Sequence, residues 1–306
     1  MTLIPRAQLR ERGVSDGEVR SAIRAGTIAA VRRGYYVDTS ESHDRYLLEI
    51  RAALMASSAD MVLSHTSAAA VHGIAVWPDD DRVHLTVNRS TGGRRSRLRI
   101  VHASRLHPDD VEVVDGLRVT SPARTVVDLA CSRSFESAVC SGDSALRRIE
   151  KTELADTLDR SGGRRGIDRA RRAVAFMDGR SESVGESRSR VYLQRHGFPT
   201  PRLQVELRDT NGVFVARPDF LLDGVIGEFD GMVKYREFGD SSDAVIAEKR
   251  REDRLRALGW QVARWGWDEL TTGVPADRIR RALEVASTLP PPRTVDCTPP
   301  STSHKS

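Results

Sequence analysis

Residues 217–231 read Arg-Pro-Asp-Phe-Leu-Leu-Asp-Gly-Val-Ile-Gly-Glu-Phe-Asp-Gly, two apolar runs separated by an Asp-Gly pair. An Asp-Gly pair between such runs favours a tight turn, so we expect two adjacent antiparallel strands. Glu228 and Asp230 stand two positions apart on the second strand, so they project from the same face of the sheet. Strand pairing would bring Asp219 beside them, and the sequence therefore predicts a cluster of carboxylates.

Carboxylates that converge in this way repel one another and resist burial. A hard divalent cation removes that repulsion, and Mg²⁺ takes oxygen ligands while it keeps water molecules for chemistry. In phosphodiester hydrolysis such a metal lowers the pKa of a bound water and offsets charge in the transition state. The cluster is therefore a candidate site for Mg²⁺ or Mn²⁺. The simpler alternative is that Asp219, which follows a proline, only caps its strand.

The elements expected around this segment follow the order αβββαβα. Helices are expected at 184–196, 243–258 and 275–287, and strands at 202–208, 213–222, 225–230 and 260–265. These elements define a predicted C-terminal domain at 179–288, entered through a short polar linker. Residues 289–306 are rich in Pro, Ser and Thr, and we expect them to form a disordered tail.

The segment resembles the PD-(D/E)XK nuclease superfamily through Pro218-Asp219 and Glu228-Phe-Asp230. Its nearest likeness is to very-short-patch-repair-like endonuclease domains, which have an acidic residue on the first helix and a tryptophan-rich last strand. Here Glu186 lies on the expected first helix, and Gly259-Trp-Gln-Val-Ala-Arg-Trp-Gly-Trp267 ends the likeness. The resemblance implies a restriction-endonuclease-like fold in which Asp219, Glu228 and Glu186 ligate the metal.

The family pattern places a lysine two residues after the second acid, where this chain has Asp230. The resemblance implies that Asp230 binds metal or water and that Lys249 or Lys234 assists the attacking water. Lysine is rare in this chain, which otherwise uses arginine, so two lysines near the segment fit that role. The alternative for the helix around Lys249 is a solvated, salt-bridged face.

The N-terminal stretch Leu9–Val37 reads LRERGVSDGEVRSAIRAGTIAAVRRGYYV. It predicts two short helices over 5–26, the second opened by a Ser15/Glu18 capping box, and then a hairpin over 28–37. The stretch resembles the winged-helix domain of AbiE-type antitoxins of type IV toxin–antitoxin systems. The resemblance implies a DNA-binding segment at 1–40.

Four arginines are candidate DNA contacts in that segment. In a winged helix the second helix of the pair enters the major groove and the hairpin contacts phosphate. Arg20 and Arg24 are therefore candidate groove readers, and Arg32 and Arg33 are candidate phosphate contacts. The alternative for each arginine is ordinary solvated surface.

The region 41–178 is expected to mix strands with helices. Ser64-His-Thr-Ser-Ala-Ala-Ala-Val-His-Gly73 and the segment 115–130 resemble the region that follows the winged helix in actinobacterial AbiE-type antitoxins. His65 and His72 stand seven residues apart on an expected helix with no evident third ligand. We expect these two histidines to be packed or capped rather than to bind a metal.

Composition fits a protein that handles nucleic acid without proving it. The net charge is +5, and the three cysteines form no CxxC or Cys/His cluster, which argues against a zinc finger or a disulfide framework. No apolar run reaches the roughly 20 residues of a membrane helix, and no secretory signal is visible. A cytoplasmic location is therefore expected. The fold class is multidomain α/β: an N-terminal winged helix, an α+β middle region, and the C-terminal αβββαβα domain.

Two functional interpretations follow. The first is a DNA-binding protein whose C-terminal domain is a Mg²⁺- or Mn²⁺-dependent endonuclease. The second is a non-enzymatic, antitoxin-like transcriptional regulator that keeps the nuclease fold only for binding. The antitoxin resemblance further implies a toxin partner protein, and a homodimer would suit palindromic DNA sites.

Overall fold

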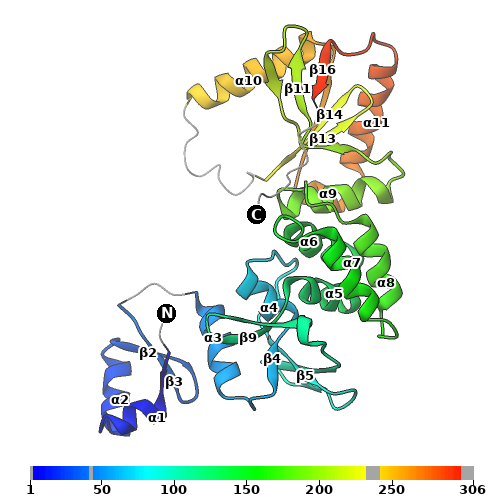
Figure 1. Cartoon of the computed structure of the whole chain (residues 1–306). Helices are drawn as coiled ribbons and strands as arrows, with labels where there is room; N and C mark the ends of the chain where they lie inside the picture. Colours follow the sequence, from blue (N-terminus) through cyan, green and yellow to red (C-terminus); the bar gives the residue numbers. More distant parts are fainter. Residues whose placement is uncertain (1–2, 41–43, 232–241, 298–306) are drawn as a thin grey trace. The chain divides into compact units, whose positions relative to one another are not determined.

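A computed structural model describes residues 3–40, 44–231 and 242–297, and it divides the chain into two units, Met1–Phe176 and Met177–Ser306. Helices and strands are mixed in both units (Figure 1). The expected multidomain α/β class is thus confirmed.

Unit 1 begins with two helices and a small sheet. The elements are β1 (Ile4–Pro5), α1 (Arg6–Glu11), α2 (Asp16–Arg24), β2 (Ile28–Arg32) and β3 (Tyr35–Asp38). The three strands form an antiparallel sheet in the order β1-β3-β2. The predicted capping box of α2 is confirmed: Ser15 Oγ accepts the Glu18 N–H at 3.2 Å, and Glu18 Oε2 accepts the Ser15 N–H at 2.7 Å.

The middle of unit 1 is a six-stranded sheet in the order β6-β7-β5-β4-β9-β8. Its strands are β4 (Met61–Leu63), β5 (Val83–Asn88), β6 (Arg94–Arg95), β7 (Arg99–Ser104), β8 (Val111–Val114) and β9 (Leu117–Thr120). Helices α3 (Arg45–Met55) and α4 (His65–His72) pack on it, because Ile50 and Ala68 share a core with Leu63, Leu85 and Val119.

Four helices complete unit 1. They are α5 (Pro122–Ser132), α6 (Phe135–Ala145), α7 (Lys151–Arg160) and α8 (Ile167–Phe176), and a 3-10 helix, η1 (Pro108–Asp110), precedes β8. Figure 1 shows the four helices gathered into one group. Helix α5 contacts the other three and also α4, so it links the helical group to the sheet.

Unit 2 is built on a four-stranded sheet, β10-β13-β14-β15, and a three-stranded sheet, β12-β11-β16. The strands are β10 (Arg202–Leu203), β11 (Glu206–Asp209), β12 (Phe214–Ala216), β13 (Phe220–Leu222), β14 (Val225–Asp230), β15 (Gln261–Gly266) and β16 (Thr294–Cys297). The helices are α9 (Val184–Arg195), α10 (Ser242–Ala257), η3 (Asp268–Thr271) and α11 (Val274–Ser287).

Alternate residues of the larger sheet supply two different cores. On one face Phe220 and Trp265 pack with Leu193 of α9 and Ile279 of α11. On the other face Ile226 packs with Leu255 of α10 and with residues of the smaller sheet. Because side chains alternate along a strand, the sheet is covered on both faces.

Two expectations for unit 2 were wrong. The single strand expected at 213–222 is two strands, β12 and β13, which belong to different sheets. Pro218 lies between them, and since proline has no N–H to donate to a ladder, the strand breaks there.

The tail expected to be disordered at 289–306 instead contains β16, which pairs antiparallel with β11 from Glu206↔Cys297 to Asp209↔Thr294. This pairing gives partners to the backbone groups of an otherwise open edge of β11, a tertiary contact that composition does not reveal. Residues 298–306 lie outside the described part of the chain.

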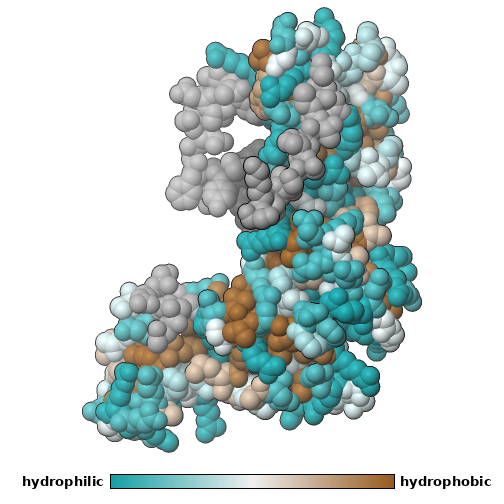
Figure 2. Space-filling view, in the orientation of Figure 1, coloured by the Kyte–Doolittle hydropathy of each residue, from teal (hydrophilic) through white to brown (hydrophobic). Residues whose placement is uncertain are grey.

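Hydrophilic residues make up most of the face seen in Figure 2, with hydrophobic residues in smaller groups. Among the residues that the structure describes, no helix has the length and hydropathy needed to cross a bilayer.

Candidate functional site

Asp219 stands just before β13 and turns its carboxylate toward β14. Its Oδ2 accepts the backbone N–H of Phe229 at 2.8 Å, and its Oδ1 accepts the side-chain amide of Gln204 at 3.2 Å. The antiparallel pairing of Phe220 with Gly227 sets this register. Gly224 adopts the positive φ (72°) that the tight Asp-Gly turn requires.

Glu186 lies in the first turn of α9, where its carboxylate completes the helix cap. Oε1 accepts the Ser183 hydroxyl at 2.8 Å and Oε2 accepts the Glu182 N–H at 2.8 Å. Gln204 also donates to Glu186 Oε2 at 3.0 Å. A single buried amide therefore contacts both Glu186 and Asp219, which brings the two acids together. Gln204 was not expected from the sequence.

Helix α9 approaches β14 closely because of one glycine. A Cβ built on Gly185 would lie 1.9 Å from Phe229 Cε1, far inside van der Waals contact with a ring that packs against the core. Only glycine permits this approach. The absence of a side chain at 185 thus allows the neighbouring Glu186 to lie near Asp219.

Asp219 is a partly buried carboxyl group with two other acidic side chains nearby. The pKa of Asp219 is raised to about 6, chiefly by burial and also by the negative charges of Glu186 and Glu228, while the hydrogen bonds from Phe229 and Gln204 act in the opposite direction. A carboxyl group with a raised pKa in such surroundings gains from a bound cation, which offsets the negative charge.

Glu228 differs from the other two acids because arginines bind it. Arg251 Nη2 lies 2.8 Å from its Oε1, and Arg264 Nε lies 2.7 Å from its Oε2. Within the described residues, Glu186, Asp219 and Glu228 do not form a group whose ligand atoms all lie within 4.8 Å of one another. The structure thus brings Glu186 and Asp219 together and gives Glu228 other partners.

The remaining predicted catalytic residues lie in different surroundings. Asp230 is exposed at the end of β14, and Lys249 is exposed on α10. Lys234 lies outside the described residues. The oxygen donors of Glu186 and Asp219 suit a hard divalent cation such as Mg²⁺ or Mn²⁺.

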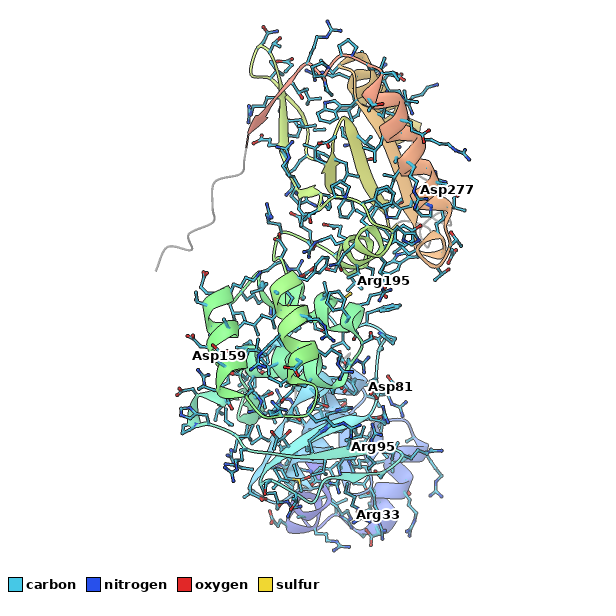
Figure 3. All side chains as sticks on the ribbon, turned by 90° about the vertical axis from the view of Figure 1, so that its right-hand side faces the viewer. Arg33, Asp81, Arg95, Asp159, Arg195 and Asp277 are labelled. Atoms are coloured by element: carbon cyan, nitrogen blue, oxygen red, sulfur yellow. The ribbon has the colours of Figure 1, made fainter. Side chains whose placement is uncertain are left out.

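The four predicted DNA-binding arginines lie on the first helical pair and hairpin of unit 1. Arg20 and Arg24 are exposed on α2, whose opposite face buries Val19. Arg33 is exposed in the turn between β2 and β3 (Figure 3), whereas Arg32 is half-buried at the end of β2. Three of the four arginines are therefore exposed to solvent.

Unit 1 also contains a histidine cluster that the sequence did not predict. His65, the first residue of α4, meets His84 of β5 and His102 of β7. The parallel pairing of β5 and β7, in which Thr86 stands opposite His102, brings two of them together. His72, which was expected to be packed or capped, lies outside this cluster, and its Nε2 contacts the Thr120 carbonyl at 2.7 Å. The sequence feature that could have indicated this cluster is that His84 and His102 each lie within a short β-prone segment.

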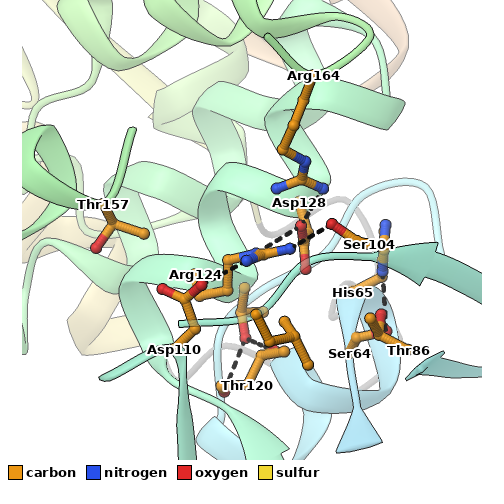
Figure 4. A network of polar contacts seen from close by, with 12 residues as sticks. Ser64, His65, Thr86, Ser104, Asp110, Thr120, Arg124, Asp128, Thr157 and Arg164 are labelled. Carbon is orange, nitrogen blue, oxygen red and sulfur yellow. Dashed lines mark hydrogen bonds and ion pairs between the residues drawn. The ribbon is translucent and has the colours of Figure 1, made fainter. Parts of the chain in front are cut away.

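A buried ionic network lies beside this cluster (Figure 4). Arg124 of α5 is 1% exposed; its Nη1 lies 2.5 Å from Asp110 Oδ2, and its Nε lies 2.9 Å from Asp128 Oδ1. Arg164 also contacts Asp128 Oδ1, at 2.6 Å. Burial alone would raise the pKa of Asp128, but the positive charges of Arg124 and its neighbours hold it well below its usual range.

Comparison with known proteins locates one family within unit 1. The sequence model of one protein family, the AbiEi antitoxin C-terminal domain, matches residues 52–176. This match confirms the antitoxin resemblance over those residues, which contain the six-stranded sheet and helices α4 to α8.

Two Mycobacterium tuberculosis proteins are similar in sequence: the uncharacterized protein MT2308 of strain CDC 1551 and the uncharacterized protein Rv2248 of strain H37Rv. Each is 33% identical over 181 residues, which cover 56% of this chain and 64% of the relative. The chain thus spans less than two thirds of the length of these relatives. A crystal structure, of the RV2827C protein from Mycobacterium tuberculosis, aligns with a TM-score of 0.42 and 17% identity over 57% of this chain and 72% of that one.

Proposed function

We propose that the chain is a DNA-binding, antitoxin-like regulator that acts with a toxin partner protein. The observation that carries the proposal is the match of residues 52–176 to the AbiEi antitoxin C-terminal domain. A helical pair and a hairpin with exposed arginines precede the matched residues in the same unit. DNA binding belongs to that N-terminal part.

The geometry of α2 supports a role in the major groove. Val19 is buried and anchors the helix, while Arg20 and Arg24 are one helical turn apart and exposed. Exposed Arg33 at the hairpin turn supplies a third cation of the kind that contacts phosphate. A positive surface of this kind binds duplex DNA with strong salt dependence.

Replacing Arg20 and Arg24 together with alanine is expected to weaken DNA binding by about 1–3 kcal/mol per arginine. Fluorescence anisotropy with a duplex from the region upstream of the coding sequence, over a series of salt concentrations, measures this. Arg33→Ala should lower the salt slope by about 1, as for one lost phosphate contact. Arg45, 85% exposed on α3, gives the control variant Arg45→Ala. Equal binding by all variants would reject this DNA surface.

A second candidate function rests on unit 2. Glu186 and Asp219 share Gln204, and the raised pKa of Asp219 marks a site that a cation would relieve. We infer that these two residues would hold Mg²⁺ or Mn²⁺ for phosphodiester hydrolysis. The metal supplies an activated water and offsets charge on the phosphate. Glu228 would become a third metal ligand only if its ion pairs with Arg251 and Arg264 were broken.

Cleavage of plasmid and short duplex DNA with Mg²⁺ or Mn²⁺ tests this candidate. Asp219→Asn and Glu186→Gln are expected to abolish any cleavage by the unmodified protein, because each removes a negatively charged oxygen donor. Asp223→Asn, at an exposed acid in the neighbouring turn, is the matched control and should leave cleavage unchanged. If the unmodified protein binds DNA but does not cleave it, the nuclease candidate is rejected and the regulator remains the proposed function.

A further inference from the structure

We propose that His65, His84 and His102 bind one divalent transition-metal ion of the zinc class, with a fourth coordination position open to an arginine-lined cavity. The three residues come from α4, β5 and β7, all in unit 1. One ring nitrogen from each lies within 4.8 Å of the other two. Three imidazoles with an open position are a donor set that zinc uses in proteins.

The distances between the rings support a shared metal. His84 Nδ1 and His102 Nε2 lie 3.1 Å apart. Two nitrogens on a tetrahedral zinc, each bonded at about 2.0–2.1 Å, are separated by about 3.3 Å. His65 stacks on His102 with ring centroids 3.7 Å apart, so its ring turns about its side-chain torsions when it joins the metal.

The outer nitrogens of two rings face groups that would orient them. His84 Nε2 lies 3.4 Å from Asp80 Oδ2, close but without hydrogen-bond alignment. His65 Nδ1 lies 3.0 Å from Ser64 Oγ, which accepts the Thr86 hydroxyl at 2.8 Å. Carboxylate and hydroxyl groups behind ligating histidines fix the rings in metal sites. This leaves His84 Nδ1 and His65 Nε2 for the metal.

Two further features favour a ligand over simple packing. Asp128 Oδ2 is buried without a hydrogen bond, and its charge acts on both His65 and His102. Such a carboxylate offsets the charge of a nearby cation. His65 also has a positive φ of 51°, an uncommon conformation for a residue with a Cβ, and such strain concentrates at functional positions.

The open position would face a cavity of about 830 Å³ that His65 and His102 help to line. Its wall carries the arginines Arg94, Arg95, Arg164, Arg165 and Arg169. Arg164 Nη1 and Arg169 Nε are buried without hydrogen-bond partners. An anion of the phosphate type could contact these guanidinium groups and the metal together, because both favour oxygen anions.

The test is a titration of metal-free, full-length protein with Zn²⁺ in competition with a chromogenic chelator. One equivalent should bind tightly, and Co²⁺ should give the visible bands of a four-coordinate site with nitrogen ligands. His84→Gln and His102→Gln should each lower the affinity at least tenfold, and Asp80→Asn about 10–100-fold. His72→Gln, a histidine of α4 outside the cluster, is the matched control and should bind as the unmodified protein does.

Circular dichroism checks that each variant is folded. Zn²⁺ should raise the unfolding temperature of the unmodified protein and the His72→Gln variant, but not that of His84→Gln or His102→Gln. The proposal is overturned if the unmodified protein binds no tight equivalent, or if the cluster variants bind as well as the control. Because the readout is metal binding, failure here is separate from failure of DNA binding or cleavage.

Discussion

Replacing Arg124 with leucine is expected to destabilise unit 1 by about 3–5 kcal/mol. The substitution leaves Asp110 and Asp128 buried without the guanidinium that lies 2.5 Å and 2.9 Å from them. Removing one partner of a buried ion pair costs this much because the remaining charge stays desolvated. Ser104 Oγ and the Arg105 carbonyl also lose their hydrogen bonds from Arg124. Urea unfolding of the full chain measures the change.

The control is Arg171→Leu on α8, where a half-exposed arginine pairs with Asp168. An exposed pair of this kind contributes about 0–1 kcal/mol. Adding Asp110→Asn to Arg124→Leu should restore part of the lost stability, since Asp110 then carries no buried charge, whereas Asp128 keeps Arg164 at 2.6 Å from its Oδ1. A loss below about 1 kcal/mol for Arg124→Leu alone contradicts the assigned role of the network.

Asp219→Asn is expected to have the opposite effect, stabilising unit 2 by roughly 2–3 kcal/mol at pH 8. Folding raises the pKa of Asp219 from its ordinary value of 3.8 to about 6. The folded state therefore binds this proton more tightly, so the contribution of Asp219 to stability is greatest below pH 4 and is lost as the pH rises through about 6. Each pKa unit corresponds to about 1.4 kcal/mol, and asparagine removes the buried charge.

Urea unfolding at pH 5 and at pH 8, monitored by tryptophan fluorescence, compares the stability of the Asp219→Asn variant with that of the unmodified protein. The stabilisation by Asp219→Asn should be largest at pH 8 and about half as large at pH 5, where the unfolded carboxyl is ionised but the folded one is mostly protonated. Exposed Asp223→Asn should change stability little at either pH. A stabilisation that does not depend on pH would show that the carboxyl charge is not its cause.

Local patterns predicted the parts of the fold that depend on neighbouring residues. The Asp-Gly turn predicted the pairing of β13 with β14, and the capping box predicted where α2 begins. Pro218 is also a local feature, and it divides the single strand expected at 213–222 into β12 and β13. Such features could be predicted because the physical cause lies within a few residues of its effect.

The rest of the candidate sites depends on pairing between distant segments. Arg264 reaches Glu228 through the parallel pairing of β14 with β15, which nothing near residue 228 reveals. Gln204 contacts two acids because β10 pairs with β13 and because its own φ is positive (54°). His84 and His102 meet only because β5 and β7 are parallel neighbours.

The pairing of β16 with β11 bears on how the protein folds during synthesis. The six-stranded sheet of unit 1 uses residues up to Thr120, so it can assemble while the ribosome is still producing the later part of the chain. The smaller sheet of unit 2 lacks its edge strand until Cys297 has left the exit tunnel. Until then β11 has an unpaired edge, and an edge of this kind is a template on which a strand of another chain can pair.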